Sequence, residues 1–199
     1  MQDDGSKGYH GRDDDLDAPG LRVGIRSADP ARDAAACAAI YAPHVTDGLA
    51  TFEEVAPDAA EMAARIARVQ ATHPWLVLED DGRVTGFAYA SPHHPRAGYR
   101  WAADVAVYVD AGHRRRGVGR RLYQELLGRL RGQGFRRVCA IIVLPNPGSV
   151  GLHEALGFSR VGVFERVGWK HGAWHDVGWW QLDLGGPDGP PREPGPPVG

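Results

Sequence analysis

The sequence predicts an α/β fold in which helices flank a mixed central sheet. Short apolar runs of strand character alternate along the chain with longer segments whose apolar residues recur at helical spacing. Strands and helices in this order build one layered sheet rather than a bundle or a sandwich. The length of 199 residues suits a single domain.

The composition divides the chain into a body and two tails. Residues 1–20 are rich in Asp and Gly with little apolar content and are expected to be disordered. Residues 185–199 form a Pro/Gly tail that is also expected to be disordered, so the folded domain is expected at 21–184. The net charge of −2 and the absence of a long apolar run indicate neither a nucleic-acid nor a membrane partner. The two cysteines lack C-x-x-C spacing, and a cytoplasmic location is expected.

The first half of the body is predicted to hold a short strand, two helices and a hairpin. Pro30 and Pro43 bound an Ala-rich helix, and the turn at Asp80, Asp81 and Gly82 separates two apolar runs. The predicted elements are a strand at 21–26, helices at 31–41 and 58–70, and hairpin strands at 75–79 and 84–90.

The second half carries a longer strand, a long helix and a final pair of strands. Gly134 closes the long helix and Gly157 stops a short one. The predicted elements are a polar loop at 91–101, a strand at 102–109, a helix at 117–133, a strand at 137–143, a helix at 149–156, and two strands around a turn at 170–173.

A basic turn joins the strand at 102–109 to the long helix. A helix start presents unpaired N–H groups and a positive dipole, and Gly117 and Gly119 leave room for an anion to approach. A solvated helix start or a nucleic-acid patch would also be basic, but the paired glycines after a strand favour a diphosphate. Neither a G-x-x-x-x-G-K-S/T loop nor a dinucleotide fingerprint is present. The predicted phosphate-binding residues are Arg114, Arg115, Arg116, Gly117, Val118, Gly119 and Arg120.

The spacing R-x-x-G-x-G at Arg114, Gly117 and Gly119 resembles the acetyl-CoA loop of the GNAT superfamily of N-acetyltransferases. The resemblance implies the GNAT fold, in which two neighbouring parallel strands splay apart. It also implies acetyl-CoA as cosubstrate, with its pantetheine arm paired to the backbone of Val107, Tyr108 and Val109.

A second segment bears on the proton chemistry. Acetyl transfer to an amine needs a base for the ammonium proton and a donor for the departing thiolate. The superfamily often places Asn at a helix start and Tyr seven residues later; this chain has Asn146 and His153 there. Ser149 lies one helical turn before His153, so both can face one cleft. Asn146 and Ser149 are therefore predicted to contact the cofactor, and His153 to be catalytic.

Three motifs resemble phosphinothricin N-acetyltransferases and their methionine sulfoximine relatives over about residues 21–184. They run from His153 to Phe158, from Trp169 to Trp180, and from Tyr99 to Trp101. The resemblance implies that Asp104 is a second catalytic residue, and that relatives form homodimers. Two routes stay open: His153 as base supported by Asp104, or His153 as proton donor to sulfur. The implied substrate-binding residues are Phe52, Arg96 and Tyr99.

The substrate stays open at this stage. Glu53, His93 and His94 stand where herbicide-resistance members are expected to carry positive or aromatic residues, so methionine sulfoximine, methionine sulfone or another amino acid competes with phosphinothricin. Alternatives are a polyamine, an aminoglycoside, a protein N-terminus, or a non-catalytic CoA-binding domain. His171 and His175 cross a turn without a third ligand, and no metal is predicted.

Overall fold

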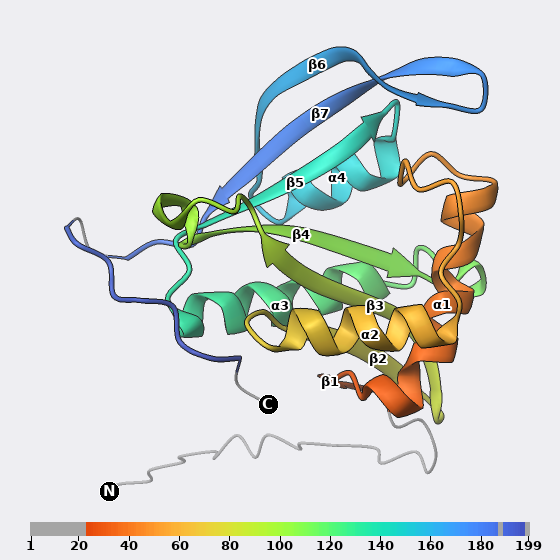
Figure 1. The fold of residues 1–199 in the computed structure, drawn as a ribbon, viewed down its shortest axis with the longest axis horizontal. Helices are drawn as coiled ribbons and strands as arrows, with labels where there is room; N and C mark the ends of the chain where they lie inside the picture. Colours follow the sequence, from red (N-terminus) through yellow and green to blue (C-terminus); the bar gives the residue numbers. More distant parts are fainter. Residues whose placement is uncertain (1–22, 187–188, 198–199) are drawn as a thin grey trace, which may run out of the picture.

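The computed structural model describes residues 23–186 and 189–197 and contains a seven-stranded sheet with the order β1-β2-β3-β4-β5-β7-β6 (Figure 1). The pair β4–β5 is parallel and its neighbours pair antiparallel, so the predicted mixed sheet is confirmed. The strands are β1 Gly24–Ser27, β2 Trp75–Asp80, β3 Arg83–Pro92, β4 Ala102–Val109, β5 Arg137–Leu144, β6 Ser159–Lys170 and β7 Ala173–Asp183.

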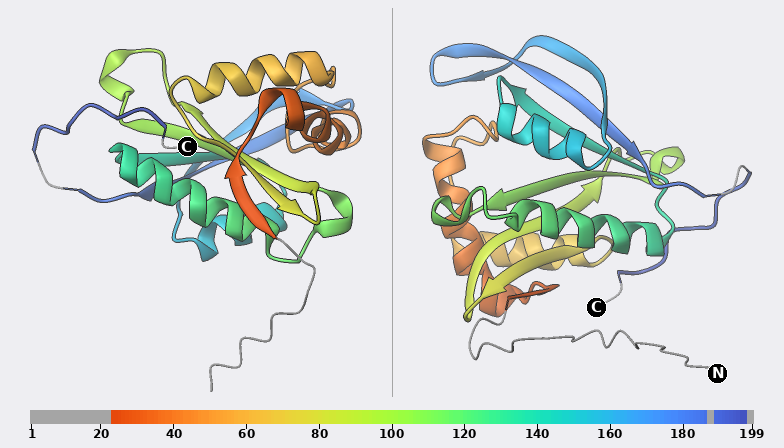
Figure 2. Two further views of the ribbon diagram at one scale, coloured as in Figure 1. Left: turned by 90° about the horizontal axis from the view of Figure 1, so that it is seen from below. Right: turned by 180° about the vertical axis from the view of Figure 1, so that it is seen from behind.

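Helices cover both faces of the sheet. The four α-helices are α1 Pro30–Thr46, α2 Ala59–Gln70, α3 Val118–Gln133 and α4 Pro147–Ala155. Figure 2 shows α1 and α2 on one face, and α3 and α4 on the other. Two 3₁₀ turns, η1 Ala97–Tyr99 and η2 Ala111–His113, flank β4. No helix in the described part of the chain is both long and apolar enough to cross a membrane.

Each face of the sheet has its own apolar core. Leu122, Leu126 and Leu130 on α3 are fully buried against β2, β3 and β4. On the other face, Tyr108 of β4 packs with Tyr41 of α1. Because successive side chains of a strand point to opposite faces, β4 contributes Ala103 and Val105 to the first core and Tyr108 to the second.

Most element boundaries follow local rules. Asp58 caps α2 by accepting from the Glu61 amide at 2.8 Å, and Gly134 ends α3 in the left-handed conformation. Asp81 and Gly82 both have positive φ, which is the geometry of a tight two-residue hairpin turn.

The predicted helix end at Pro43 is wrong, because α1 continues to Thr46. Proline removes the N–H that would bond the Ala39 carbonyl, but Ala39 is exposed and water can satisfy that group. One turn later Val45 is 1% exposed in the core, so continuing the helix buries it. The predicted strand at 21–26 is displaced to Gly24–Ser27, and residues 1–22 lie outside the described residues.

The β6–β7 hairpin is fastened to the loop between α1 and α2. The buried Lys170 ammonium donates to the carbonyl of Thr51 at 2.7 Å and of His44 at 3.3 Å. His171 reaches the Gly48 carbonyl at 3.3 Å. The motif that contains Trp169 and Trp174 therefore fixes the loop that carries Phe52.

Residues 192–195 of the C-terminal tail lie against the body. Glu193 forms an ion pair with Arg100 at 2.7 Å, and the Trp101 indole N–H donates to the Arg192 carbonyl at 2.7 Å. The Gly195 amide donates to the Gln133 carbonyl at the end of α3, and the Gln133 side-chain amide donates to the Gly195 carbonyl. These contacts tie the tail to the loop that precedes β4, and the sequence alone does not indicate them.

We predict that Gly168→Ala lowers the free energy of unfolding by about 1–3 kcal/mol, because overpacking forces its neighbours to move. A Cβ atom at Gly168 would overlap the Phe52 ring. Gly162→Ala is the matched control, since it lies on the same strand and a Cβ atom there meets nothing within 4 Å. Urea unfolding of both variants measures the difference. Equal stability of the two would contradict the close packing of Phe52 on β6.

Candidate active site

The strands β4 and β5 pair over a short stretch and then separate. Their register pairs are Ala102 with Arg137, Ala103 with Val138, and Asp104 with Cys139. Beyond this point β4 stays paired to β3 and β5 stays paired to β7, so the two strands diverge (Figure 1). Backbone N–H and C=O groups of β4 that would face β5 are thereby left available to a ligand chain.

A small pocket occupies the splay. Of the predicted cofactor residues, Val107, Tyr108, Asn146 and Ser149 line it together with His153. The other lining residues are Ala50, Val105, Ala106, Tyr123, Ile141, Ile142 and Val143. The structure therefore brings the predicted strand and the predicted α4 residues to one place. Asn146 also caps α4 by accepting from the Ser149 amide at 3.0 Å.

The basic turn lies at the end of the same strand. Gly117 has φ 80° and precedes α3 without a side-chain cap, so the first N–H groups of the helix are not occupied by a capping oxygen. Arg115 also has positive φ, at 59°. A Cβ atom at Gly119 would lie 3.6 Å from Val109 and 3.4 Å from Leu152, so larger side chains would crowd this passage. Four arginine side chains of the turn are exposed, namely Arg114, Arg115, Arg116 and Arg120.

These features fit acetyl-CoA on structural grounds. The helix start and the arginines suit a diphosphate, and the unpaired edge of β4 suits an amide-bearing arm. Val118, which is 7% exposed, anchors the turn in the core, and Val109 ends the strand that leads to it.

His153 is buried and has two partners. Its Nδ1–H donates to the Ser149 carbonyl at 2.7 Å, and its Nε2 accepts from the Tyr123 hydroxyl at 3.1 Å. The donor roles follow because a carbonyl can only accept. Burial lowers the pKa of His153, which favours the neutral imidazole at physiological pH. Tyr123 sits at a helical spacing that fits an ordinary core residue, so its contact with His153 could not be predicted from the sequence.

Asp104 is hydrogen-bonded to His93 and not to His153. The His93 Nδ1–H donates to the Asp104 carboxylate at 2.7 Å, and both side chains are half-buried. Burial raises the pKa of Asp104, and the hydrogen bond from His93 partly opposes that shift. Among the described residues, neither Asp104 nor His153 bonds to the other. In the sequence, His93 stands out only because herbicide-resistance members are expected to carry an aromatic or positive residue there, and its contact with Asp104 was not predicted.

The predicted substrate residues come from two sides. The Tyr99 ring lies 6.0 Å from His93 and 4.7 Å from His94, and Arg96 is exposed just before η1. Phe52 lies below the β6–β7 hairpin, 6.4 Å from the His175 ring. Tyr99 is therefore grouped with Asp104 through His93, the Arg96 amide donates to His94 at 3.1 Å, and Phe52 packs against β6 and β7 instead.

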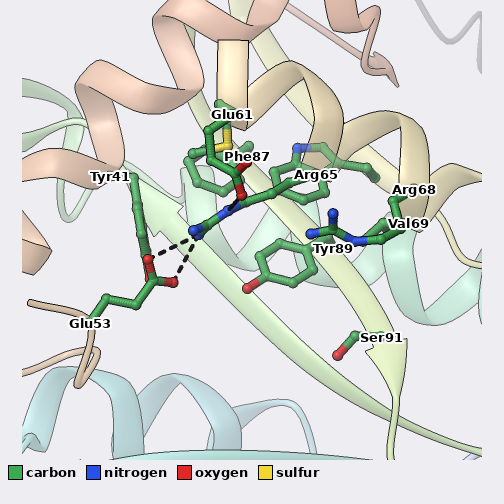
Figure 3. A pocket seen from close by; sticks show the side chains of 11 residues that line it. Tyr41, Glu53, Glu61, Arg65, Arg68, Val69, Phe87, Tyr89 and Ser91 are labelled. Carbon is green, nitrogen blue, oxygen red and sulfur yellow. Dashed lines mark hydrogen bonds and ion pairs between the residues drawn. The ribbon is translucent and has the colours of Figure 1, made fainter. Parts of the chain in front are cut away.

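A cavity of about 350 Å³ lies between α2 and β3 (Figure 3). Glu53 reaches into it, accepts from Arg65 at 2.8 and 3.0 Å, and accepts from the Tyr41 hydroxyl at 2.9 Å. Arg68 also lines this cavity. The Glu53 charge, which the sequence suggested would oppose an acidic substrate, is thus balanced by Arg65.

His171 and His175 each contact a backbone carbonyl. His175 Nε2 lies 3.0 Å from the Lys170 carbonyl, and His171 Nε2 lies 3.3 Å from that of Gly48. These partners give both imidazoles a structural role in the hairpin.

Comparisons with known proteins agree with this site. The model of the acetyltransferase (GNAT) family matches residues 42–158. The phosphinothricin N-acetyltransferase of Streptomyces viridochromogenes is 43% identical over 170 residues, which cover 85% of this chain and 92% of that protein. The L-methionine sulfoximine/L-methionine sulfone acetyltransferase of Pseudomonas paraeruginosa is 37% identical over 148 residues, 73% of this chain and 86% of that one.

A solved structure has the same fold. The GNAT superfamily phosphinothricin acetyltransferase from Sinorhizobium meliloti, in complex with acetyl-CoA, superposes with a TM-score of 0.82 at 38% identity. The match covers 86% of this chain and 94% of that chain. The splayed strands, the basic helix start and these matches lead to one conclusion: the chain belongs to the acetyltransferase (GNAT) family.

Proposed function

We propose that the chain is an N-acetyltransferase that moves acetyl from acetyl-CoA to the amine of a compact amino-acid-like substrate. Phosphinothricin, methionine sulfoximine and methionine sulfone define the substrate type, as the names of its relatives indicate. One observation carries the proposal: a half-buried carboxylate, Asp104, stands where β4 and β5 begin to separate. This position supports a proton acceptor close to the place proposed for the thioester.

The cofactor is proposed to lie along β4 and end at the basic turn. The turn from Arg114 to Arg120 would bind the diphosphate, and the backbone of 107–109 would pair with the pantetheine arm. Acetyl-CoA supplies the activated acetyl group. Ser149 and Asn146 line the pocket next to the position expected for the thioester.

Asp104 is proposed to accept the proton of the attacking amine. Burial raises the pKa of its carboxyl, which makes the carboxylate a better base, and His93 fixes its orientation. This pairing supports a base at Asp104 with His93, in place of a base at His153 supported by Asp104.

His153 and Tyr123 are proposed to serve the thiolate. Both line the pocket in the splay, and the Tyr123 hydroxyl is held by the His153 imidazole. The Tyr123 hydroxyl carries one proton, which it can give to the departing sulfur by turning away from the His153 Nε2 that holds it in the pocket before the reaction. His153 then acts as a positioning residue for Tyr123 and not as the base for the amine.

Tyr99 and Arg96 are proposed to bind the polar end of the acceptor, with Phe52 as an apolar wall. Tyr99 packs beside the His93–Asp104 pair, and the exposed Arg96 guanidinium can turn toward a carboxylate of the acceptor. Arg65 and Arg68 add cationic groups on the neighbouring cavity.

A homodimer formed through the β6–β7 hairpin is also proposed. This hairpin exposes Val161, Phe164 and Val167, which are 61%, 57% and 53% exposed. Trp169 and Trp174 extend the same apolar surface. The two free cysteines, Cys37 and Cys139, support a reducing compartment such as the cytoplasm.

We predict that the purified protein releases free CoA from acetyl-CoA when methionine sulfoximine, methionine sulfone or phosphinothricin is added. Asp104→Asn should lower kcat by about 10²–10⁴-fold, the usual contribution of a general base. Asp183→Asn, which alters an exposed carboxylate paired with Arg137, is the matched control. Thiol release measured with a chromogenic disulfide reports turnover. Absence of turnover on these amines and on a panel of amino acids would overturn the proposed substrate class.

We predict that His93→Ala moves the acid limb of the kcat/KM pH profile to higher pH. The sign follows because the hydrogen bond from His93 lowers the pKa of Asp104, so its loss raises the pKa at which the base becomes protonated. His94→Ala is the control, because His94 packs against Tyr99 and makes no hydrogen bond with Asp104 among the described residues. A limb that stays in place, or moves to lower pH, would remove Asp104 from the role of base.

We predict that Phe164→Asp converts a dimer to a monomer, because it places a charge in the centre of the apolar hairpin surface. Val55→Asp is the control: Val55 is 81% exposed but lies in the loop between α1 and α2. Size-exclusion chromatography with light scattering gives the mass of each variant. A wild-type protein that is already monomeric would rule the dimer out.

A further inference from the structure

Three metal-ligating side chains that are far apart in sequence meet at the start of the splay. The ligand atoms of His93, Asp104 and Cys139 all lie within 4.8 Å of one another. They come from the segment after β3, from β4 and from β5. Asp104 and Cys139 face each other at the last register pair before the strands separate, and His93 lies 2.7 Å from Asp104.

We propose that the His93–Asp104–Cys139 cluster binds a divalent transition metal ion of the zinc type, and that the bound metal inhibits acetyl transfer. Imidazole nitrogen, carboxylate oxygen and thiolate sulfur are the ligands that Zn²⁺ takes in proteins. A thiolate in the set favours zinc-type ions over Mg²⁺ or Ca²⁺, which prefer oxygen ligands.

The geometry needs a small contraction. Metal–ligand distances of about 2.0–2.3 Å place the ligands of a tetrahedral ion about 3.5 Å apart. The present separations of up to 4.8 Å therefore close by about 1 Å. His93 belongs to the loop before η1, outside the hydrogen-bonded ladder of β3, so it can move toward the two strand residues. Asp104 and Cys139 already share one face of the sheet because they are register partners.

The surroundings favour a cation. The ion pair recorded for Asp104 within the described residues is with His93, so its carboxylate has no Lys or Arg partner there. All three ligands are half-buried, which shields them from bulk water and still leaves a path for an ion. Three protein ligands leave a fourth position open to water or to a group of the acceptor.

The inhibitory effect rests on the proposed function of Asp104. A metal ion on its carboxylate occupies the lone pair that would accept the proton of the amine. The ion also neutralises the negative charge that would attract an ammonium group to this place. Chelation of the metal should therefore restore activity without any change in the protein.

The binding half of the proposal is tested on the full chain with Co²⁺ as a spectroscopic probe. Wild-type protein should give a near-ultraviolet thiolate-to-cobalt absorption band that saturates at one ion per chain and disappears on addition of Zn²⁺. Cys139→Ser should abolish the band. Cys37→Ser is the matched control, because Cys37 is fully buried on α1 and should keep it. No band in the wild type, or a band lost with Cys37, would overturn the site.

The inhibitory half is tested by the ratio of turnover in Zn²⁺ to turnover in EDTA. Loss of a residue that supports a metal ligand costs about 10–100-fold in metal affinity. Loss of the ligand Cys139 should therefore raise the Zn²⁺ concentration needed for inhibition by at least this factor. Each variant is compared with itself, so a change in basal rate does not affect the ratio. Equal Zn²⁺ sensitivity of Cys139→Ser and wild type would overturn the regulation. Because the cobalt band needs no turnover, failure of the metal site and failure of the proposed acetyl transfer are distinguished.

Discussion

The separation of β4 from β5 is the constraint on which the rest of the site depends. The two strands share three register pairs, and then each follows its antiparallel neighbour, β3 on one side and β7 on the other. A sheet cannot leave backbone groups unpaired in its interior without another partner for them. The fold therefore leaves backbone groups of β4 that an extended ligand can pair with. Asp104 lies at the point where these unpaired groups begin.

Two polar pairs stand on either side of this opening, and they differ in character. His93 and Asp104 are half-buried, so the side of the opening that is proposed to bind the amine keeps contact with water. His153 and Tyr123 are almost fully buried, so the side that is proposed to serve the thiolate is shielded from water. Buried polar groups need partners, and both protons of this pair have one: His153 Nε2 accepts the Tyr123 hydroxyl proton, and the Ser149 carbonyl accepts the His153 Nδ1–H.

Sequence patterns were sufficient to predict features that depend on residues close together in the chain, such as helix ends and tight turns. Gly134, Asp58 and the Asp81–Gly82 turn signal their own boundaries, and the resemblance carried by Arg114, Gly117 and Gly119 led to the correct family. Partnerships between distant residues were not predictable in this way. His93 meets Asp104, and Tyr123 meets His153, only because β3, β4, α3 and α4 converge. Pro43 misled the boundary of α1 because the burial of Val45, a tertiary effect, outweighs one lost hydrogen bond.

The contacts of residues 192–195 have a consequence for how substrate preference can change. Arg100 and Trp101 belong to the segment that holds Tyr99, and both are bound by the tail. Gln133 joins the same tail to the end of α3. Substitutions in this proline-rich stretch can thus shift the segment that holds Tyr99, which is proposed to bind the acceptor, while the proposed catalytic groups stay as they are. A change in the acceptor that this chain takes can therefore start outside the catalytic centre.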